Sequence, residues 1–183
     1  MTAQDTTSET DLGQPDEESV RLPGSFDAFY SSEFPRMVDL AYALSGSRIA
    51  AEDLAQEALL AAHASWDRVG VLDRPGAWVR RVVINKAASL YQRRAAEIRA
   101  LARLAPLRGS SFLSVDSDTA HVWNEVRKLP RRQAQVIALF YLDQMSISEI
   151  AHVLEVAEGT VKAHLHQARE TLAPMLESQG EPS

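Results

Sequence analysis

The chain has 183 residues, 45% of them hydrophobic, which is enough for a packed core in one domain or in two small ones. It contains no cysteine, so disulfides, thiolate zinc sites and a cysteine nucleophile are excluded. The sequence has neither a long apolar run nor a signal-like N-terminus, which predicts a cytoplasmic protein without membrane insertion. The net charge of −6, taken by itself, argues against a nucleic-acid partner.

The distribution of charge along the chain reverses the argument that the net charge makes against a nucleic-acid partner. Residues 1–20 hold six acids and no Lys or Arg, so the remainder carries 19 acids and 19 bases. Within residues 74–108, nine bases accompany a single acid, Glu97. A locally basic segment matters more for phosphate binding than the total charge. The composition therefore allows a nucleic-acid ligand. The alternative explanation of the basic segment is a solvated helix face followed by a basic linker.

The N-terminal part of the chain changes character near residue 23. Residues 1–22 are acidic and nearly devoid of apolar side chains, so they cannot bury enough surface to offset their ordering entropy, and we expect disorder. Residues 26–44 have apolar side chains at helical spacing. Pro35 predicts a break or kink in this helix, and Gly46 with Ser47 predicts its end.

A second helix is predicted from about Ala50 to Trp66, and it carries two stripes. The inward stripe is apolar and consists of Leu54, Ala58, Ala62 and Trp66. About a quarter-turn away, Asp53, Glu57 and Leu60 recur at i, i+4 and i+7. An acidic and apolar stripe beside a core face suits a partner surface, although a partly buried flank gives the same pattern.

The next helix follows a loop at residues 67–74, with Pro75 in its first turn. One half of this helix is apolar, with Val79, Val82, Val83, Ala87 and Leu90. The opposite half is mixed, with Trp78, Arg81, Asn85, Ala88 and Gln92. Aromatic, basic and amide groups along one helix can stack on exposed bases and hold phosphates. A single tryptophan such as Trp78 is more often a core residue.

Residues 101–118 have the Pro, Gly and Ser content of a linker, and a second domain is predicted over residues 119–177. Val122, Val126 and Leu129 line its first helix, which Pro130 stops, and residues 131–142 form another. No strand pattern or internal repeat is present. The expected fold is all-α, with two small helical domains joined by a flexible linker.

Residues 145–172 predict a helix-turn-helix at the end of the second domain. Ser146 and Glu149 have the spacing of a capping box, and residues 156–159 supply the turn. The second helix places Val161, Leu165, Ala168 and Leu172 on one face, with Lys162, His166 and Arg169 on another flank. A helix held by a partner and presenting polar and basic groups fits a major groove. A plain packing unit is the alternative.

Three segments in this order resemble a known family. They are residues 51–58 (AEDLAQEA), residues 74–86 (RPGAWVRRVVINK) and residues 129–142 (LPRRQAQVIALFYL), the last followed by the helix-turn-helix. Over about residues 26–176 the chain resembles a bacterial RNA polymerase sigma factor of the extracytoplasmic-function group. The resemblance implies an acidic tail (1–22), a region 2 domain (23–100), a linker (101–118) and a region 4 domain (119–177).

The resemblance also implies partners and roles. The partners would be core RNA polymerase and promoter DNA, with an anti-sigma factor as a further candidate. The chain would have no enzyme activity and would use no cofactor, metal or small-molecule substrate. Contacts with polymerase would come from Asp53, Gln56, Glu57 and Leu60. The loop at 67–74 would take a base flipped from the −10 element, which would also be held by Arg74, Trp78, Arg80, Arg81, Asn85 and Lys86. The −35 element would be read by Arg131, Thr160, Lys162, His164, His166 and Arg169.

The second helix of the helix-turn-helix departs from the family pattern. Members of the family often have a Ser-Arg pair after the Lys and another Arg three positions beyond, whereas this chain has Ala163, His164 and Gln167 there. The helix is therefore less basic, which implies fewer phosphate contacts or an unusual −35 sequence. Because His164 and His166 are two positions apart on a helix, they point in different directions and do not suggest a shared metal site.

Three other functions compete with that of a sigma factor. A free-standing helix-turn-helix regulator acting without polymerase would explain the second domain but not the stripe on the predicted 50–66 helix. An adaptor would bind polymerase without reading DNA. An enzyme would need a ligand set or a triad that the dispersed histidines do not supply.

Overall fold

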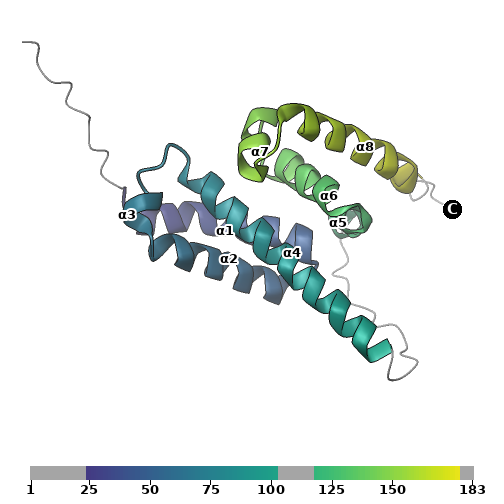
Figure 1. Cartoon of the computed structure of the whole chain (residues 1–183), viewed down its shortest axis with the longest axis horizontal. Coiled ribbons are helices and arrows are strands. Elements are labelled where there is room, and N and C mark those ends of the chain that lie inside the picture. Colours follow the sequence, from purple (N-terminus) through teal and green to yellow (C-terminus); the bar gives the residue numbers. More distant parts are fainter. Residues whose placement is uncertain (1–23, 103–117, 178–183) are drawn as a thin grey trace, which may run out of the picture.

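The structure is a computed structural model that describes residues 24–102 and 118–177, and every regular element in these ranges is a helix. The first range holds α1 (Phe26–Ser45), α2 (Arg48–His63), α3 (Trp66–Val69) and α4 (Pro75–Ala102). The second holds α5 (Asp118–Lys128), α6 (Arg131–Ile137), η1 (Ala138–Leu142), α7 (Ile147–Leu154) and α8 (Glu158–Glu177). Figure 1 shows the second set lying along one side of α4. The expected all-α fold with two small domains is confirmed; the acidic tail and most of the predicted linker lie outside the described residues.

Helices α1, α2 and α4 pack on one another around a core of fully buried side chains that includes Met37, Leu40 and Leu59. Of the break or kink predicted at Pro35, a break does not occur, because α1 continues through this residue to Ser45. Pro35 is exposed, so the carbonyl that loses its amide partner there can be hydrated. Gly46 ends α1 as expected, with φ at 73° and its amide donating to the Tyr42 carbonyl at 2.9 Å.

Trp66 does not extend the inward stripe of α2, as the sequence had predicted. Helix α2 ends at His63, and Trp66 begins the short helix α3. The indole Nε1 of Trp66 donates to the Gly24 carbonyl at 2.8 Å, and its ring meets that of Phe26 edge-on with centroids 5.2 Å apart. Trp66 therefore holds the start of α1 in place.

The predicted helix-turn-helix is formed by α7 and α8. The capping box is present, since the Ser146 hydroxyl accepts from the Glu149 amide and Glu149 Oε2 accepts from the Ser146 amide at 2.8 Å. The predicted inward face of α8 is buried at Val161, Leu165, Ala168 and Leu172. The single helix expected over 131–142 is instead α6 followed by a π-helical turn, η1. Apolar spacing did not reveal this change, because it depends on hydrogen bonds that close wider rings.

The two halves share one continuous core. Helix α4 packs against α7, and α1 packs against α5 and η1. Arg127 of α5 reaches across to the end of α1, where Nη1 donates to the Ala43 carbonyl at 3.1 Å. Burial lowers the pKa of Arg127, but the free carbonyls at a helix C-terminus favour a cation there. Within the described residues, no helix is both long and apolar enough to cross a bilayer.

Gly46 serves both α1 and Arg127, and its replacement should be costly. A Cβ at this position would lie 2.9 Å from Arg127 Nε, and the positive φ disfavours any L side chain. We expect Gly46→Ala to lower the free energy of unfolding by at least about 1–2 kcal/mol, measured by urea denaturation with circular dichroism. Gly159→Ala is the matched control, because a Cβ there meets no atom within 4 Å. Equal destabilisation by the two substitutions would contradict this role for Gly46.

Candidate nucleic-acid and partner interfaces

The exposed face of α2 brings together four predicted partner-binding residues. Asp53, Gln56, Glu57 and Leu60 are all exposed, with Leu60 at 66%. They lie at i, i+3, i+4 and i+7 and therefore share one face of the helix. Ile49, one turn before Asp53 and 77% exposed, adds a second large apolar side chain to this face. We call residues 49, 53, 56, 57 and 60 the α2 face; Ile49 was missed, although its position four residues before Asp53 could have found it.

Helix α4 borders the α2 face through an ion pair. Lys86 Nζ lies 2.6 Å from Glu57 Oε2. Beyond this pair, a groove of about 590 Å³ runs between α2 and α4, and its α4 side includes Arg93 and Arg94. Asn85 is exposed on the same helix. This part of α4 therefore carries cations and an amide at the surface, groups of the kind that contact phosphate backbones.

The start of α4 forms a second groove, of about 490 Å³, whose opposite wall is α7. Arg74, Trp78 and Arg81 line one wall, and Glu155 is among the residues on the other. Arg81 pairs through both terminal nitrogens with the Glu155 carboxylate. Arg74 Nη1 lies 3.4 Å from Glu149 Oε1. Trp78 is partly buried against the core. Three predicted DNA-binding residues therefore face the helix-turn-helix of the same chain.

Arg80 is a buried cation that joins the two halves. Its guanidinium donates from Nε to Asp143 Oδ2 at 3.0 Å and from Nη1 to Glu33 Oε2 at 2.8 Å. The side chains of Arg80, Asp143 and Glu33 are only 8%, 4% and 15% exposed. Burial alone would lower the pKa of Arg80, but the hydrogen bonds and charges of Asp143 and then Glu33 outweigh it, and the pKa is raised. Loss of one partner from such a pair costs about 3–5 kcal/mol.

This arrangement bears on the prediction that Arg80 holds promoter DNA. Its side chain points inward, and a Cβ at Gly76 would lie 2.7 Å from Nη1, so the glycine leaves room for the guanidinium. Arg80 can reach DNA only if Asp143 moves away with its half of the molecule. Sequence reasoning missed both of its partners, because Glu33 and Asp143 are distant in the chain and carry no motif of their own.

The outward side of α8 presents the other predicted DNA-binding residues. Thr160, Lys162, His166 and Arg169 are exposed, as is Arg131 at the start of α6. Arg169 Nε donates to the Tyr141 hydroxyl at 2.9 Å, and its guanidinium lies over the Tyr141 ring at 5.6 Å from the centroid. His164 is half-buried, and its Nδ1 has no hydrogen-bond partner. Tyr141 was not predicted and is the aromatic support of Arg169.

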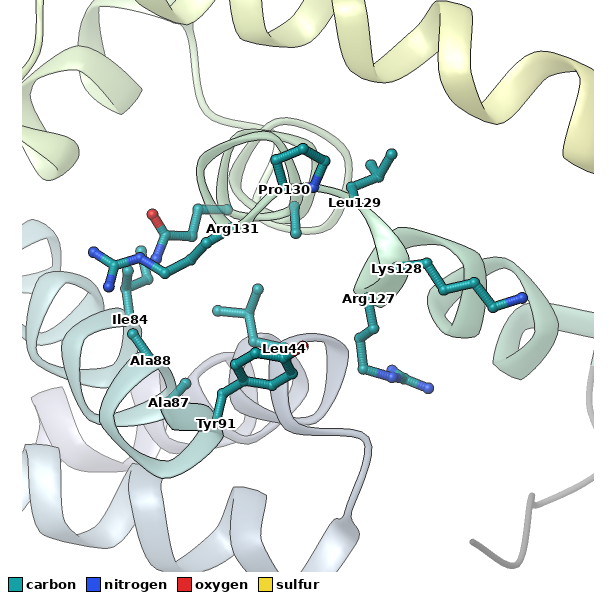
Figure 2. Close-up of a pocket in the computed structure, with 12 residues that line it drawn as sticks. Leu44, Ile84, Ala87, Ala88, Tyr91, Arg127, Lys128, Leu129, Pro130 and Arg131 are labelled. Atoms are coloured by element: carbon teal, nitrogen blue, oxygen red, sulfur yellow. The ribbon is translucent and has the colours of Figure 1, made fainter. Parts of the chain in front are cut away.

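A third groove, of about 400 Å³, lies where α1, α4 and the α5–α6 junction meet. Figure 2 shows Leu44 and Tyr91 facing Pro130 across it, with Arg127 and Arg131 on either side. Among the residues that the structure describes, no three His, Asp or Glu side chains gather closely enough to hold a metal ion.

Comparison with known proteins identifies both halves. Residues 29–97 match the family sigma-70 region 2, and residues 122–172 match sigma-70, region 4. The chain is 31% identical to the RNA polymerase sigma-E factor of Streptomyces avermitilis over 129 residues, which are 70% of this chain and 72% of that protein. It is 26% identical to the ECF RNA polymerase sigma factor SigW of Bacillus subtilis over 155 residues, 77% of this chain and 83% of the relative.

Solved structures share the fold. The sigma factor RpoE of Bartonella quintana, in complex with the anti-sigma factor NepR, aligns with a TM-score of 0.69 at 22% identity. The alignment covers 85% of this chain and 98% of that one. CnrH in complex with the cytosolic domain of CnrY aligns with a TM-score of 0.62 at 23% identity, over 85% of this chain and 89% of that chain.

The capping box makes the stability of the helix-turn-helix depend on pH. Hydrogen bonds from the backbone and side chain of Ser146, and then the charge of Arg74, lower the pKa of Glu149 from 4.5. A lowered folded-state pKa means that the charged form contributes stability above about pH 4.5, and that this is lost as pH falls through the folded pKa. We expect Glu149→Gln, which can still form a capping box, to unfold at lower urea than the wild type near neutral pH. The difference should vanish at strongly acidic pH; a constant difference would contradict the assignment.

Proposed function

The chain belongs to the extracytoplasmic-function sigma factors, which bind core RNA polymerase and direct transcription from promoters, and we propose which of its surfaces carry out each task. The observation that carries the assignment is the α2 face. It is an exposed acidic and apolar surface within the region 2 match, and no other part of the described chain covers it. We assign residues 23–100 to polymerase binding and the −10 element, 101–118 to the linker, and 119–177 to the −35 element.

The α2 face is the proposed polymerase contact. Its large apolar side chains, Ile49 and Leu60, are flanked by the carboxylates of Asp53 and Glu57. Apolar anchors surrounded by charges give a protein interface its affinity and its orientation. The anchors would be buried on binding, while the acids would select a basic surface on polymerase.

The mixed half of α4, with the preceding loop, is the proposed −10 site. Flipping a base costs a few kcal/mol for unstacking, which contacts to the extruded base and its phosphates must offset. Arg74, Arg81 and Lys86 supply the phosphate contacts, and Asn85 supplies an amide to a base edge. Trp78 borders the groove and offers part of its ring for stacking.

The outward side of α8 is the proposed −35 reader. Thr160, Lys162 and His166 lie in the first half of α8, and the N-terminal part of this helix is the part that enters a major groove in helix-turn-helix proteins. Arg169 is held by Tyr141, which orients its guanidinium before DNA arrives. His164 is half-buried, so only the exposed part of its side chain would contact the −35 element. Arg131 would contact the backbone beside the groove.

The proposal extends to the setting of the protein. We infer that it has no enzyme activity of its own, since polymerase makes the RNA, and that it works in the cytoplasm with polymerase. An anti-sigma protein is proposed as a further partner on the basis of family membership alone.

Transcription of sheared genomic DNA by purified core polymerase, with and without this chain, tests the function directly. We expect new RNA starts that are preceded by two dissimilar elements at a fixed spacing. Leu60→Glu should remove an apolar anchor and weaken core binding by about tenfold or more, whereas Val122→Glu, at an exposed apolar site on α5, should not. A symmetric footprint formed without polymerase would instead indicate a free-standing regulator.

Lys162 should contribute to the −35 contact through a phosphate. We expect Lys162→Ala to weaken the binding of the holoenzyme to a promoter fragment and to reduce the slope of log affinity against log salt by about one. Lys128→Ala is the control, because Lys128 is also exposed but pairs with Glu125 on α5. Unchanged affinity and slope for Lys162→Ala would remove Lys162 from the interface and favour an adaptor that does not read DNA.

A further inference from the structure

We propose that the third groove, where α1, α4 and the α5–α6 junction meet, binds a small molecule with an apolar body and one carboxylate, such as a medium-chain fatty acid. The carboxylate would accept hydrogen bonds from Gln135 and Arg131, and the apolar body would lie on α1 and α4. Of the side chains assigned to polymerase or DNA, only Arg131 lines this groove. The site does not depend on the proposed function.

Gln135 supplies a buried hydrogen-bond donor that lacks an acceptor. Its residue is only 2% exposed and lines the groove from α6. The side-chain Oε1 accepts from Arg132 Nη1 at 3.2 Å, whereas no described residue accepts from Nε2. Buried polar groups in folded proteins are nearly always paired, because a buried donor without an acceptor destabilises the fold. An oxygen of a bound molecule would satisfy this donor.

Arg131 places a cation on the same side of α6 as Gln135, because the two residues are four positions apart. It is exposed, and no described carboxylate forms an ion pair with it. Figure 2 shows Arg131 and Ile84 on the same side of the groove. A guanidinium and an amide one turn apart can donate to the two oxygens of one carboxylate. Hydrogen bonds to a charged acceptor are stronger than those between neutral groups.

The lining of the groove is positively charged. Arg127, Lys128 and Arg131 belong to it, and no described Asp or Glu does. Lys128 has a carboxylate partner on its own helix. Arg127, in contrast, donates only to uncharged oxygens among the described residues. Its charge is therefore not neutralised by an acid of the described chain, so an anion is the ligand that complements this groove.

The remaining walls are apolar and come from both halves of the chain. Ala87 and Ala88 of α4 and Leu44 of α1 lie on one side, and Pro130 lies on the other. The volume of about 400 Å³ falls within the range of small-molecule sites, about 300–1,000 Å³, which often lie between domains and have mostly apolar walls. Tyr91, 67% exposed at the edge, would be partly covered by the bound chain. A molecule that contacts α4 and α6 together would stabilise their packing.

Calorimetric titration of the full chain with octanoate tests the site. We expect saturable binding of one molecule per chain. Octanoate should bind at least about tenfold more tightly than octanol, which lacks the charge, or acetate, which lacks the apolar body. In NMR spectra, octanoate should shift the backbone amides of Ala87, Ala88 and Leu129. Equal binding of octanol, no binding of octanoate, or shifts confined to other parts of the chain would overturn the proposal.

Substitutions on α6 test the two donors. Gln135→Met keeps the length of the side chain but removes its donor, and Arg131→Gln removes the cation, so each should weaken octanoate binding about tenfold. Arg93→Gln is the matched control, because Arg93 is an exposed arginine of α4 that lines a different groove, and it should leave the affinity unchanged. If Gln135→Met does not fold, Ala88→Leu, which fills part of the groove, should weaken binding instead. Unchanged affinity in the folded variants would contradict the assignment.

The acidic tail (1–22) is the competing occupant of a positively charged groove. The full-length variant Asp16→Asn, Glu17→Gln, Glu18→Gln distinguishes the two. We expect its ligand-free spectrum to show no shift at Ala87, Ala88 or Leu129; a shift there, with tighter octanoate binding, would assign the groove to the tail and overturn the proposal. A chain that binds octanoate as expected but does not direct promoter transcription would refute the proposed function and leave this site in place.

Discussion

The ion pairs of Arg80 are the contact on which the arrangement of this protein depends. A guanidinium removed from water must be matched by carboxylates, and it meets one from each half of the chain, Glu33 and Asp143. The contact is possible because Gly76, one turn earlier on α4, leaves the space that a Cβ would fill. Gly46 makes the corresponding space for Arg127 at the end of α1. Two arginines and two glycines thus contribute polar contacts between the halves beside the apolar core that the halves share.

The same packing separates the functional surfaces by their accessibility. Polymerase would meet an α2 face that is already exposed, and the −35 element would meet an α8 surface that is also exposed. The residues proposed for the −10 element at the start of α4 line a groove against α7. A sigma factor that is to bind two separated promoter elements gains from joining its two domains by a tether, because each weak contact raises the local concentration for the other. In the packed arrangement the two domains are instead in direct contact.

Helix α8, the proposed reader of the −35 element, has fewer cations than the family pattern, and the structure shows a partner for Arg169. Arg169 is stacked on Tyr141 and bonded to its hydroxyl, so less conformational freedom is left to lose on binding. His166 Nε2 lies 3.5 Å from Glu170 Oε1, one turn later on the same helix. Helix α8 is held by the buried face that begins at Val161, so its outward side chains share a rigid base.

The sequence by itself determined the elements and most of the exposed surfaces. Apolar spacing placed the buried faces of α2, α4 and α8; the Ser146 and Glu149 pair placed the start of α7; Gly46 placed the end of α1. It also brought Asp53, Glu57 and Leu60 to one face, because helical periodicity is a local property. Only the tertiary structure decided that Trp66 belongs to α3, that α1 passes through Pro35, and that Arg74, Arg80 and Arg81 meet acids of the other half. Those contacts join residues far apart in the chain, and charge patterns along a single helix carry no information about which distant carboxylate will be buried beside them.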